Sequence, residues 1–348
     1  MLARGSSMPC EARCSPGNLV LAERLSSRSR PRVKTCGADV RRRRRRPLHR
    51  SSVVMAAVSE SCCRDLLVVG PGVLGSLVCQ RWLKTFPAAT VIGQTNTDAS
   101  HERLVALGIS PRLKADAGES RRFPFVVFSA PPSGSDDYTA EVEAALKLWD
   151  GTGGFVFTSS TAVYAGKDGE DCDETTAQFQ IGESPRADKL LNAEAAVLGA
   201  GGCVVRLSGL YHSQRGAHMY FLKTPTLASR PDALVNLVHY EDAAAACVRA
   251  LSAQLEGSSE GGEIFLATDG VPVTREKMVE ACLACPDAYD DGAMPEFSVS
   301  DGPLGKSMTN PQTREKLGWE PVYPSFVEFV AAGAKDSFYP PKKKNTWS

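Results

Sequence analysis

Three glycines stand at G-x-G-x-x-G spacing in this chain, at Gly70, Gly72 and Gly75. A short apolar run precedes them, and a segment with apolar residues at helical spacing follows. A strand, a glycine turn and a helix in this order can hold a pyrophosphate, because the backbone approaches it closely and the helix start offers free N–H groups. We therefore predict a dinucleotide site here, with Val73 and Leu74 in the same turn. The alternative is a βα turn that binds no ligand.

The residues after the next predicted strand, 89–93, bear on the choice between NAD and NADP. An NAD site usually has a carboxylate there, about 20 residues beyond the glycines, for the ribose hydroxyls. Here small polar residues follow, including Thr95 and Asn96, with His101 and Arg103 just beyond. These leave room for a 2′-phosphate. We expect Thr95 and Asn96 to line the cofactor site and predict NADP, with NAD as the alternative.

Two further strand ends are expected to face the same ligand. A phenylalanine-rich strand ends just before Ala130 and Pro131, and hydroxyl residues crowd the end of a later strand at Ser159 and Ser160. In an open α/β sheet, ligands bind beyond the carboxyl ends of the strands. We expect Ala130 and Pro131 to contact the adenosine and phosphates, and Ser159 to lie against the cofactor.

The elements that position these residues alternate between strands and helices, which predicts a doubly wound α/β fold with a mostly parallel sheet. We place a Rossmann domain at 65–210 and 236–268, and a small lid domain at 211–235 and 269–332. A tail, 333–348, follows. The other elements named from the sequence are strands at 66–69, 123–128, 155–157 and 263–269, and helices ending near Lys84 and at 101–107, 138–149, 242–251 and 275–284.

Four segments resemble the extended short-chain dehydrogenases/reductases, the family of sugar-nucleotide epimerases and dehydratases. The segment 155–164 is similar to the family's S-S-x-x-V-Y-G, and 203–211 to its sixth strand and R-x-x-x-x-Y-G. The segment 235–244 resembles N-x-I-H-V-x-D-x-A, and 317–321 resembles L-G-W/Y-x-P. The resemblance covers roughly 65–332 and is closest to the atypical branch loosely called nucleoside-diphosphate-sugar epimerases. It implies a substrate of the sugar-nucleotide kind or another carbonyl or alcohol compound, and we also expect Gly209 at the cofactor.

In that family a serine, a tyrosine and a lysine four residues later move a proton while hydride moves to or from the nicotinamide. Ser160 matches the serine. The Tyr-x-x-x-Lys pair is not intact, because one alignment places Pro185 and Lys189 there and the other places Arg186 and Leu190.

Three alternatives follow from the broken pair. Tyr164 or Tyr211 could serve as the tyrosine with Lys189 or Arg186 lending charge, and we name Ser160, Tyr164 and Lys189 as the catalytic candidates. The protein could instead bind the nucleotide without turning it over, as a scaffold or redox sensor. Lastly, substrate or water could handle the proton. Three residues of the loop after Tyr211 could also reach a substrate, namely His218, Tyr220 and Lys223.

The formal charge of zero averages two unlike parts. Residues 1–58 hold 14 basic and three acidic side chains, a net charge of +11, so the remainder carries −11. Arginine- and serine-rich, acid-poor leaders are typical of organelle transit peptides. We predict a transit peptide over 1–56, cleavage near Ala56 and a chloroplast location. A mitochondrial address and a basic arm that binds nucleic acid are the alternatives.

The remaining composition bears on partners. No apolar run approaches the ~18–20 residues of a membrane span, and an acidic mature chain disfavours sequence-independent binding to nucleic acid. We expect a small-molecule partner of unknown identity and leave open a homodimer and an RNA-binding role. The eleven cysteines include Cys282 and Cys285, at C-x-x-C spacing. They could be a redox pair or half a zinc site, but no second pair completes one, and we favour an incidental pair and no metal.

Overall fold

The computed structural model describes residues 64–116, 121–166, 168–257, 261–290 and 292–337. The predicted transit peptide with its processing site, and most of the predicted tail, lie outside these residues. In the described part of the chain, no helix is long and apolar enough to cross a membrane.

A seven-stranded sheet organises the described residues, and every pairing within it is parallel. In order across the sheet the strands are β12 (Ile264–Ala267), β7 (Cys203–Leu207), β5 (Trp149–Ser160), β4 (Phe123–Phe128), β1 (Leu66–Val69), β2 (Val91–Thr95) and β3 (Ser110–Leu113). The order reverses at β1, where the chain first enters the sheet. The predicted doubly wound fold is confirmed.

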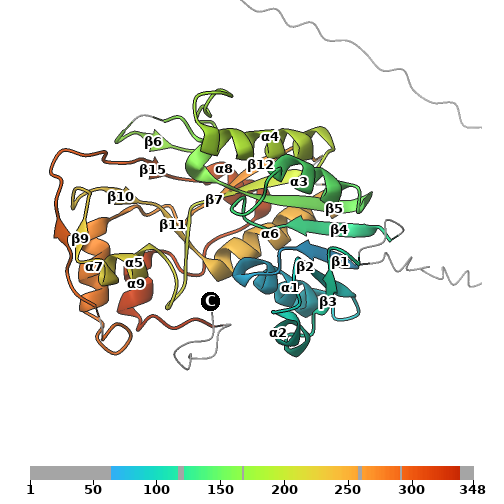
Figure 1. Cartoon of the computed structure of the whole chain (residues 1–348), viewed down its shortest axis with the longest axis horizontal. Helices are drawn as coiled ribbons and strands as arrows, with labels where there is room; N and C mark the ends of the chain where they lie inside the picture. The colour runs from blue at the N-terminus through green and yellow to red at the C-terminus, as the bar shows by residue number, and fades with distance from the viewer. Residues whose placement is uncertain (1–63, 117–120, 167, 258–260, 291, 338–348) are drawn as a thin grey trace, which may run out of the picture. The chain divides into compact units, whose positions relative to one another are not determined.

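Helices cover both faces of the sheet (Figure 1). On one face α1 (Val73–Thr85) and α6 (Tyr240–Leu255) pack into an apolar core with β1, β4 and β7, and α2 (His101–Ala106) adds Leu104 to it. On the other face α3 (Tyr138–Leu146) and α4 (Pro185–Gly199) form a second core with β4 and β5. Side-chain caps fix the starts of the last two helices: Asp137 accepts a hydrogen bond from Ala140 N and Ser184 from Ala187 N.

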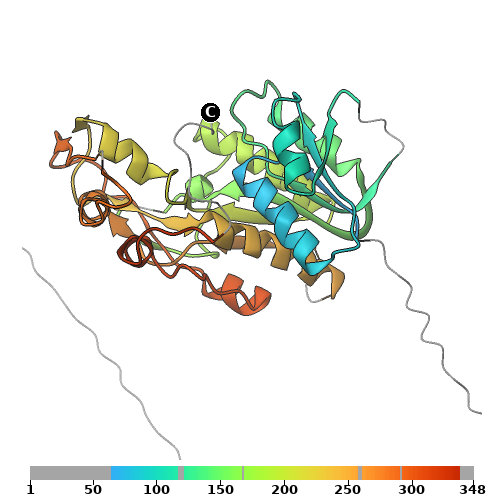
Figure 2. The same ribbon diagram turned by 90° about the horizontal axis from the view of Figure 1, so that it is seen from below.

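A smaller domain lies to one side of the sheet in both views (Figures 1 and 2). Its core is made by α5 (Ala217–Lys223), α7 (Arg275–Leu283) and α9 (Phe326–Ala331). Four short strand pairs surround it or connect it to the sheet: β8 (Gly209–Tyr211) with β11 (Leu237–His239), β9 (Thr226–Leu227) with β14 (Glu296–Phe297), β10 (Leu234–Val235) with β13 (Val273–Thr274), and β6 (Asp171–Cys172) with β15 (Ser307–Met308).

The structure corrects several predicted boundaries. The second strand runs two residues further than expected, to Thr95, and β3 was not foreseen. The helix expected to reach Trp149 ends at Leu146, because Trp149 pairs with Phe123 of β4 and starts the long strand β5. The last boundary concerns α8 (Pro311–Leu317), which we assigned to the lid domain. Leu317 and Trp319 are instead buried in the core formed by the sheet and α6.

Candidate functional site

The three glycines of the β1–α1 turn differ in what surrounds them. Gly70 has φ +79°, and a Cβ there would lie 2.6 Å from the backbone of Ala130. A Cβ on Gly75 would lie 2.7 Å from the Gly70 carbonyl oxygen, so this glycine lets α1 pack against the turn. A Cβ on Gly72 would meet no atom within 4 Å. Gly70 and Gly75 are therefore needed by the fold, whereas Gly72 leaves space that the protein itself does not fill.

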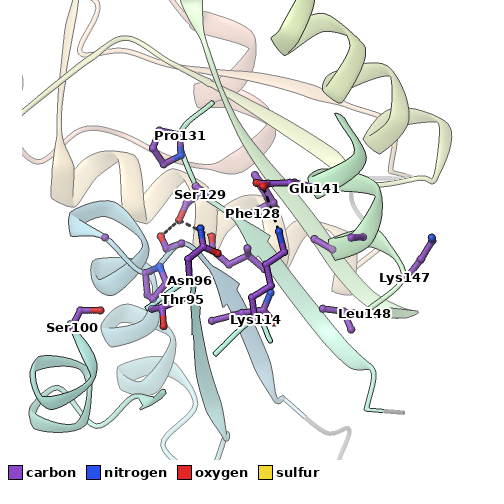
Figure 3. Close-up of a pocket in the computed structure, with 18 of the residues that line it drawn as sticks. Thr95, Asn96, Ser100, Lys114, Phe128, Ser129, Pro131, Glu141, Lys147 and Leu148 are labelled. Atoms are coloured by element: carbon purple, nitrogen blue, oxygen red, sulfur yellow. Dashed lines mark hydrogen bonds and ion pairs between the residues drawn. The ribbon is translucent and has the colours of Figure 1, made fainter. Parts of the chain in front are cut away.

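That space belongs to a cavity of about 860 Å³ at the carboxyl ends of β1, β2 and β4 (Figure 3). It brings together six of the predicted cofactor residues. They are Gly70, Gly72, Thr95, Asn96, Ala130 and Pro131. Three more predicted cofactor residues, Val73, Leu74 and Gly75, do not line the cavity. They form the first turn of α1, where Leu74 is buried and Gly75 packs against Gly70.

The charged residues of the cavity wall are mostly basic. Arg103, Lys114, Arg122 and Lys147 line it, against one carboxylate, Glu141. No carboxylate stands at the end of β2, where Gln94 is bonded to Arg112 instead. A basic wall of this kind attracts a ligand with several phosphate charges.

Arg103 is the cation nearest the glycine turn. Its guanidinium donates to the Pro71 carbonyl at 2.9 Å and to the Ser76 hydroxyl at 3.1 Å, so it lies beside the first turn of α1. The His101 ring is hydrogen-bonded to the hydroxyl of Thr95, a residue of the cavity wall, at 2.8 Å. His101 and Arg103 both belong to α2, which thus supplies polar groups to the end of β2.

Lys114 crosses the cavity from β3 towards α3, where its ammonium lies 3.4 Å from a carboxylate oxygen of Glu141 (Figure 3). The connection from β3 to β4, residues 114–122, has no helix among its described residues. The sheet face beside α3 is therefore open over β1 and β2, and the cavity extends along it to Phe128 and Leu148.

Two predicted cofactor residues do not reach this cavity. Ser159 is buried and donates to Glu194 at 2.5 Å, and Glu194 in turn pairs with Arg206 at 2.6 Å. Gly209 begins β8 and pairs with Leu237, away from the glycine turn.

A second cavity of about 940 Å³ lies between the end of β5, the start of α4 and the small domain. Its wall includes Ser160 and Arg186 from the sheet side. From the small domain come Tyr220, Asn236, Arg275 and Lys306. Of the catalytic candidates, Ser160 alone lines this cavity, and its hydroxyl oxygen accepts a hydrogen bond from Ala162 N at 3.2 Å.

The two tyrosines considered for catalysis are buried away from both cavities. Tyr164 has no exposed surface, and the Arg206 guanidinium carbon lies 4.7 Å from the centre of its ring. Burial raises the pKa of the Tyr164 phenol. Tyr211 is equally buried among Phe326, Phe329 and other rings, and burial likewise raises its pKa. Proton transfer needs a group within hydrogen-bond reach of the substrate, and these phenols face the protein interior.

The remaining candidates are divided between surface and interior. Lys189 is exposed on α4 and lines neither cavity, while Arg186, one turn earlier, lines the second. His218 is fully buried, and burial lowers its pKa to about 4. Lys223 is exposed outside both cavities, and Tyr220 lines the second one.

Sequence reasoning missed Lys114, Arg275 and Lys306 as cavity residues. Their neighbours along the chain carry no motif, and the fold brings them to the cavities from remote segments. Asn236 could have been found, since it is the asparagine of the N-x-I-H-like segment.

The C-x-x-C pair lies in the small-domain core. Both cysteines are free thiols; Cys282 is buried, and burial raises its pKa to about 12. A thiol of that pKa is a poor nucleophile near neutral pH. Among the described residues, no group of three His, Cys, Asp or Glu side chains could hold a metal ion.

Neither a protein-family model nor a curated protein sequence matches this chain. Solved structures do match it. A conserved protein of unknown function from Silicibacter pomeroyi is 21% identical with a TM-score of 0.61, over 78% of this chain and 99% of that one. UDP-glucuronic acid 4-epimerase from Bacillus cereus, solved in complex with NAD, is 17% identical with a TM-score of 0.60, over 78% and 97%.

UDP-glucose 4-epimerase from Thermotoga maritima, solved with UDP-glucose, is 17% identical with a TM-score of 0.58, over 77% of this chain and 98% of that one. The similarity spans nearly the whole length of each of these proteins and includes the sheet and the small domain. The chain therefore has the extended Rossmann fold seen in NAD-dependent epimerases and dehydratases, as its sequence motifs predict.

Proposed function

We propose that this protein binds NADP(H) in the first cavity and acts as an oxidoreductase or epimerase of the atypical short-chain dehydrogenase/reductase kind. The observation that carries the proposal is Gly72, whose missing side chain opens into a basic cavity at the start of a 13-residue helix. That combination suits a pyrophosphate, because backbone and helix N-terminus can both approach it. Structural neighbours solved in complex with NAD support a nicotinamide dinucleotide as the ligand.

The residues at the end of β2 support NADP over NAD. The side chains of Thr95, Asn96 and Ser100 would hold the adenosine ribose, and Arg103 would pair with a 2′-phosphate. An NAD site would instead offer a carboxylate to the free ribose hydroxyls. When bound, the nicotinamide supplies or accepts a hydride, and the second cavity would take a small-molecule carbonyl or alcohol substrate.

Within the second cavity, Ser160 would orient the substrate oxygen. Its oxygen already accepts a bond from Ala162 N, so its proton is free to be donated to a ligand. Because Tyr164 and Tyr211 are enclosed, proton exchange would fall to water, to the substrate or to another cavity group.

The binding claim is tested by titrating the full chain with NADPH and NADH and following the fluorescence of the reduced nicotinamide. We expect NADPH to bind more tightly. The change Arg103→Gln should weaken NADPH binding about 10- to 100-fold, the worth of a charge-assisted hydrogen bond, and leave NADH nearly unchanged. Arg249→Gln, at an exposed position of α6 outside both cavities, is the matched control.

If Arg103→Gln weakens the affinity for NADPH and NADH equally, the arginine only supports the glycine turn through its hydrogen bonds to Pro71 and Ser76. If the wild-type chain has no affinity for any dinucleotide, the proposal fails.

A second candidate is a dinucleotide-binding protein without catalysis, a scaffold or redox sensor. The enclosed Tyr164 and the exposed Lys189 favour it, because neither of these two predicted catalytic side chains reaches a cavity. Turnover of NADPH with sugar nucleotides and simple carbonyl compounds separates the two functions. Catalysis predicts that Ser160→Ala slows oxidation of NADPH, whereas a sensor binds NADPH tightly and oxidises none of them.

We also propose that the protein works in the chloroplast stroma, from the net charge of +11 in residues 1–58. Import into isolated chloroplasts, with loss of a segment ending near Ala56, is the expected result. Import into isolated mitochondria but not into chloroplasts would favour the mitochondrial location instead.

A further inference from the structure

The second cavity concentrates positive charge. Arg186, Arg275 and Lys306 line it, and the described lining contains no carboxylate. None of these three cations takes part in an ion pair of the described residues. Clustered cations without an ion-pair partner raise the local potential of a cleft and attract anions, even where the cleft is open to solvent.

The backbone around Lys306 is fixed from both domains. The Lys306 carbonyl accepts a hydrogen bond from the Asn236 amide at 2.7 Å, and Met308 N donates to the same Asn236 side chain at 2.8 Å. One residue earlier, Gly305 N donates to Asp168 at 2.6 Å. The following strand, β15, pairs with β6, and the two lie side by side in Figure 1. The lysine is thus held where the small domain meets the sheet.

Two contacts also fix the position of the Lys306 ammonium. It donates to the Tyr164 carbonyl and lies 5.5 Å from the centre of the Phe179 ring. An ammonium has three N–H donors, so two remain after the bond to Tyr164. The Tyr164 carbonyl is four residues beyond Ser160, and Ser160 lines the same cavity.

We propose that Lys306 holds a negatively charged oxygen of the ligand, a carboxylate or phosphate oxygen, beside the Ser160 hydroxyl. The proposal rests on the second cavity being the substrate site and gives that site a chemical preference. We choose Lys306 among the three cations because its ammonium is bonded to the Tyr164 carbonyl, four residues beyond Ser160, whereas Arg186 is exposed. A fixed cation beside a hydroxyl stabilises negative charge without having to reorganise.

The test is calorimetric titration of the full chain with sodium phosphate and, separately, sodium oxalate, at constant ionic strength. Lys306→Gln keeps an N–H donor for the Tyr164 carbonyl but removes the charge. We expect it to weaken binding of the preferred anion about 10- to 100-fold, and Lys306→Arg to restore most of it. Lys189→Gln, which removes an exposed lysine outside both cavities, should bind like the wild type. The anion whose binding depends more strongly on Lys306 tells phosphate from carboxylate, because the first cavity is also proposed to bind phosphate.

A second measurement needs no variant. A bound anion should slow acetylation of Lys306 by acetic anhydride, followed by peptide mass spectrometry, and leave the rate at Lys189 unchanged. Wild-type protein that binds neither anion, equal binding by Lys306→Gln, an equal loss in Lys189→Gln, or acetylation of Lys306 that is unaffected by the anion would each overturn the proposal. NADPH affinity, measured on the same samples, should not change in Lys306→Gln. A wild-type chain that binds anion but no dinucleotide would refute the proposed cofactor and leave the anion site standing.

Discussion

At the scale of single residues, the glycine turn separates what the fold needs from what the proposed ligand would need. Gly70 combines a positive φ with the backbone of Ala130 2.6 Å from where a Cβ would stand, so neither a side chain nor another conformation fits. Gly72 has an ordinary φ of −69° and open space beside it. The same residue type is therefore required for two different physical reasons within three positions.

This difference predicts opposite behaviour for two alanine variants. Gly70→Ala should lower the free energy of unfolding by roughly 2 kcal/mol or more, through strain and the clash with Ala130. Gly72→Ala should unfold like the wild type in urea but bind NADPH at least about tenfold more weakly, since its methyl group enters the space that we propose for a phosphate. Unfolding curves and fluorescence titrations measure the two effects. A Gly72→Ala protein with unchanged NADPH affinity would contradict this assignment of the cavity.

At the scale of elements, one buried network connects α4 to β5 and β7. Glu194 of α4 accepts from Ser159 of β5 at 2.5 Å and pairs with Arg206 of β7 at 2.6 Å, with both charged side chains 3% exposed. Arg206 also donates to Gln178 at 2.6 Å and stacks on the Tyr164 ring. Two residues that we predicted at the site, Ser159 and Tyr164, thus belong to this buried network and line neither cavity.

Removing one charge from this network should destabilise the folded protein. Glu194→Gln leaves the Arg206 guanidinium buried without a counter-charge, and we expect a loss of roughly 3–5 kcal/mol in the free energy of unfolding. The double change Glu194→Leu with Arg206→Met should lose less free energy of unfolding than Glu194→Gln alone, because it leaves no unpaired charge in the interior. As a control, Arg121→Gln breaks an exposed pair with Asp65 and should cost less than about 1 kcal/mol. Urea unfolding gives all three values, and a Glu194→Gln loss no larger than the control's would contradict the argument.

At the scale of the whole described chain, its last described residues, 336 and 337, are bonded to the junction between the sheet and the small domain. The Asp336 carboxylate, 4% exposed, accepts from His239 at 2.9 Å and from the Ser213 hydroxyl at 2.5 Å. The next residue, Ser337, donates through its backbone N–H to Glu241 at 2.9 Å. Residues after β8, at the end of β11 and at the start of α6 therefore meet the final described segment.

The charge of Asp336 makes this contact sensitive to acid. Burial alone would raise the pKa of Asp336, but hydrogen bonds from His212, His239 and Ser213 hold it well below its usual range. Its contribution to stability is therefore present above about pH 4, the unfolded-state pKa, and is lost as the pH falls through the lower folded-state pKa. Asp336→Asn should reduce stability at pH 7 and make the loss below pH 4 shallower.

Urea unfolding between pH 2 and pH 8 measures this effect. Asp287→Asn, at an exposed position, should leave the profile unchanged. An Asp336→Asn profile parallel to that of the wild type would show that other groups govern the acid limb.

Part of this structure could be predicted from the sequence, and part could not. The glycine turn and the residues at the ends of β1, β2 and β4 were predictable, because the strand ends of a parallel sheet meet at one edge whatever the details. The second cavity was not, since it depends on long-range contacts: Lys306 and Tyr164 are 142 positions apart. The tyrosines were misjudged as accessible because a strand end gives no information on which side chains the small domain covers.

The two cavities have no lining residue in common. One is built from the β1–α1, β2–α2 and β4–α3 connections and α3, the other from the end of β5, the start of α4 and the small domain. A substitution in one wall thus replaces no residue of the other, so we expect the two proposed ligand preferences to be separable by mutation and to have changed independently over evolution. The same separation would let an engineer exchange one specificity while retaining the other.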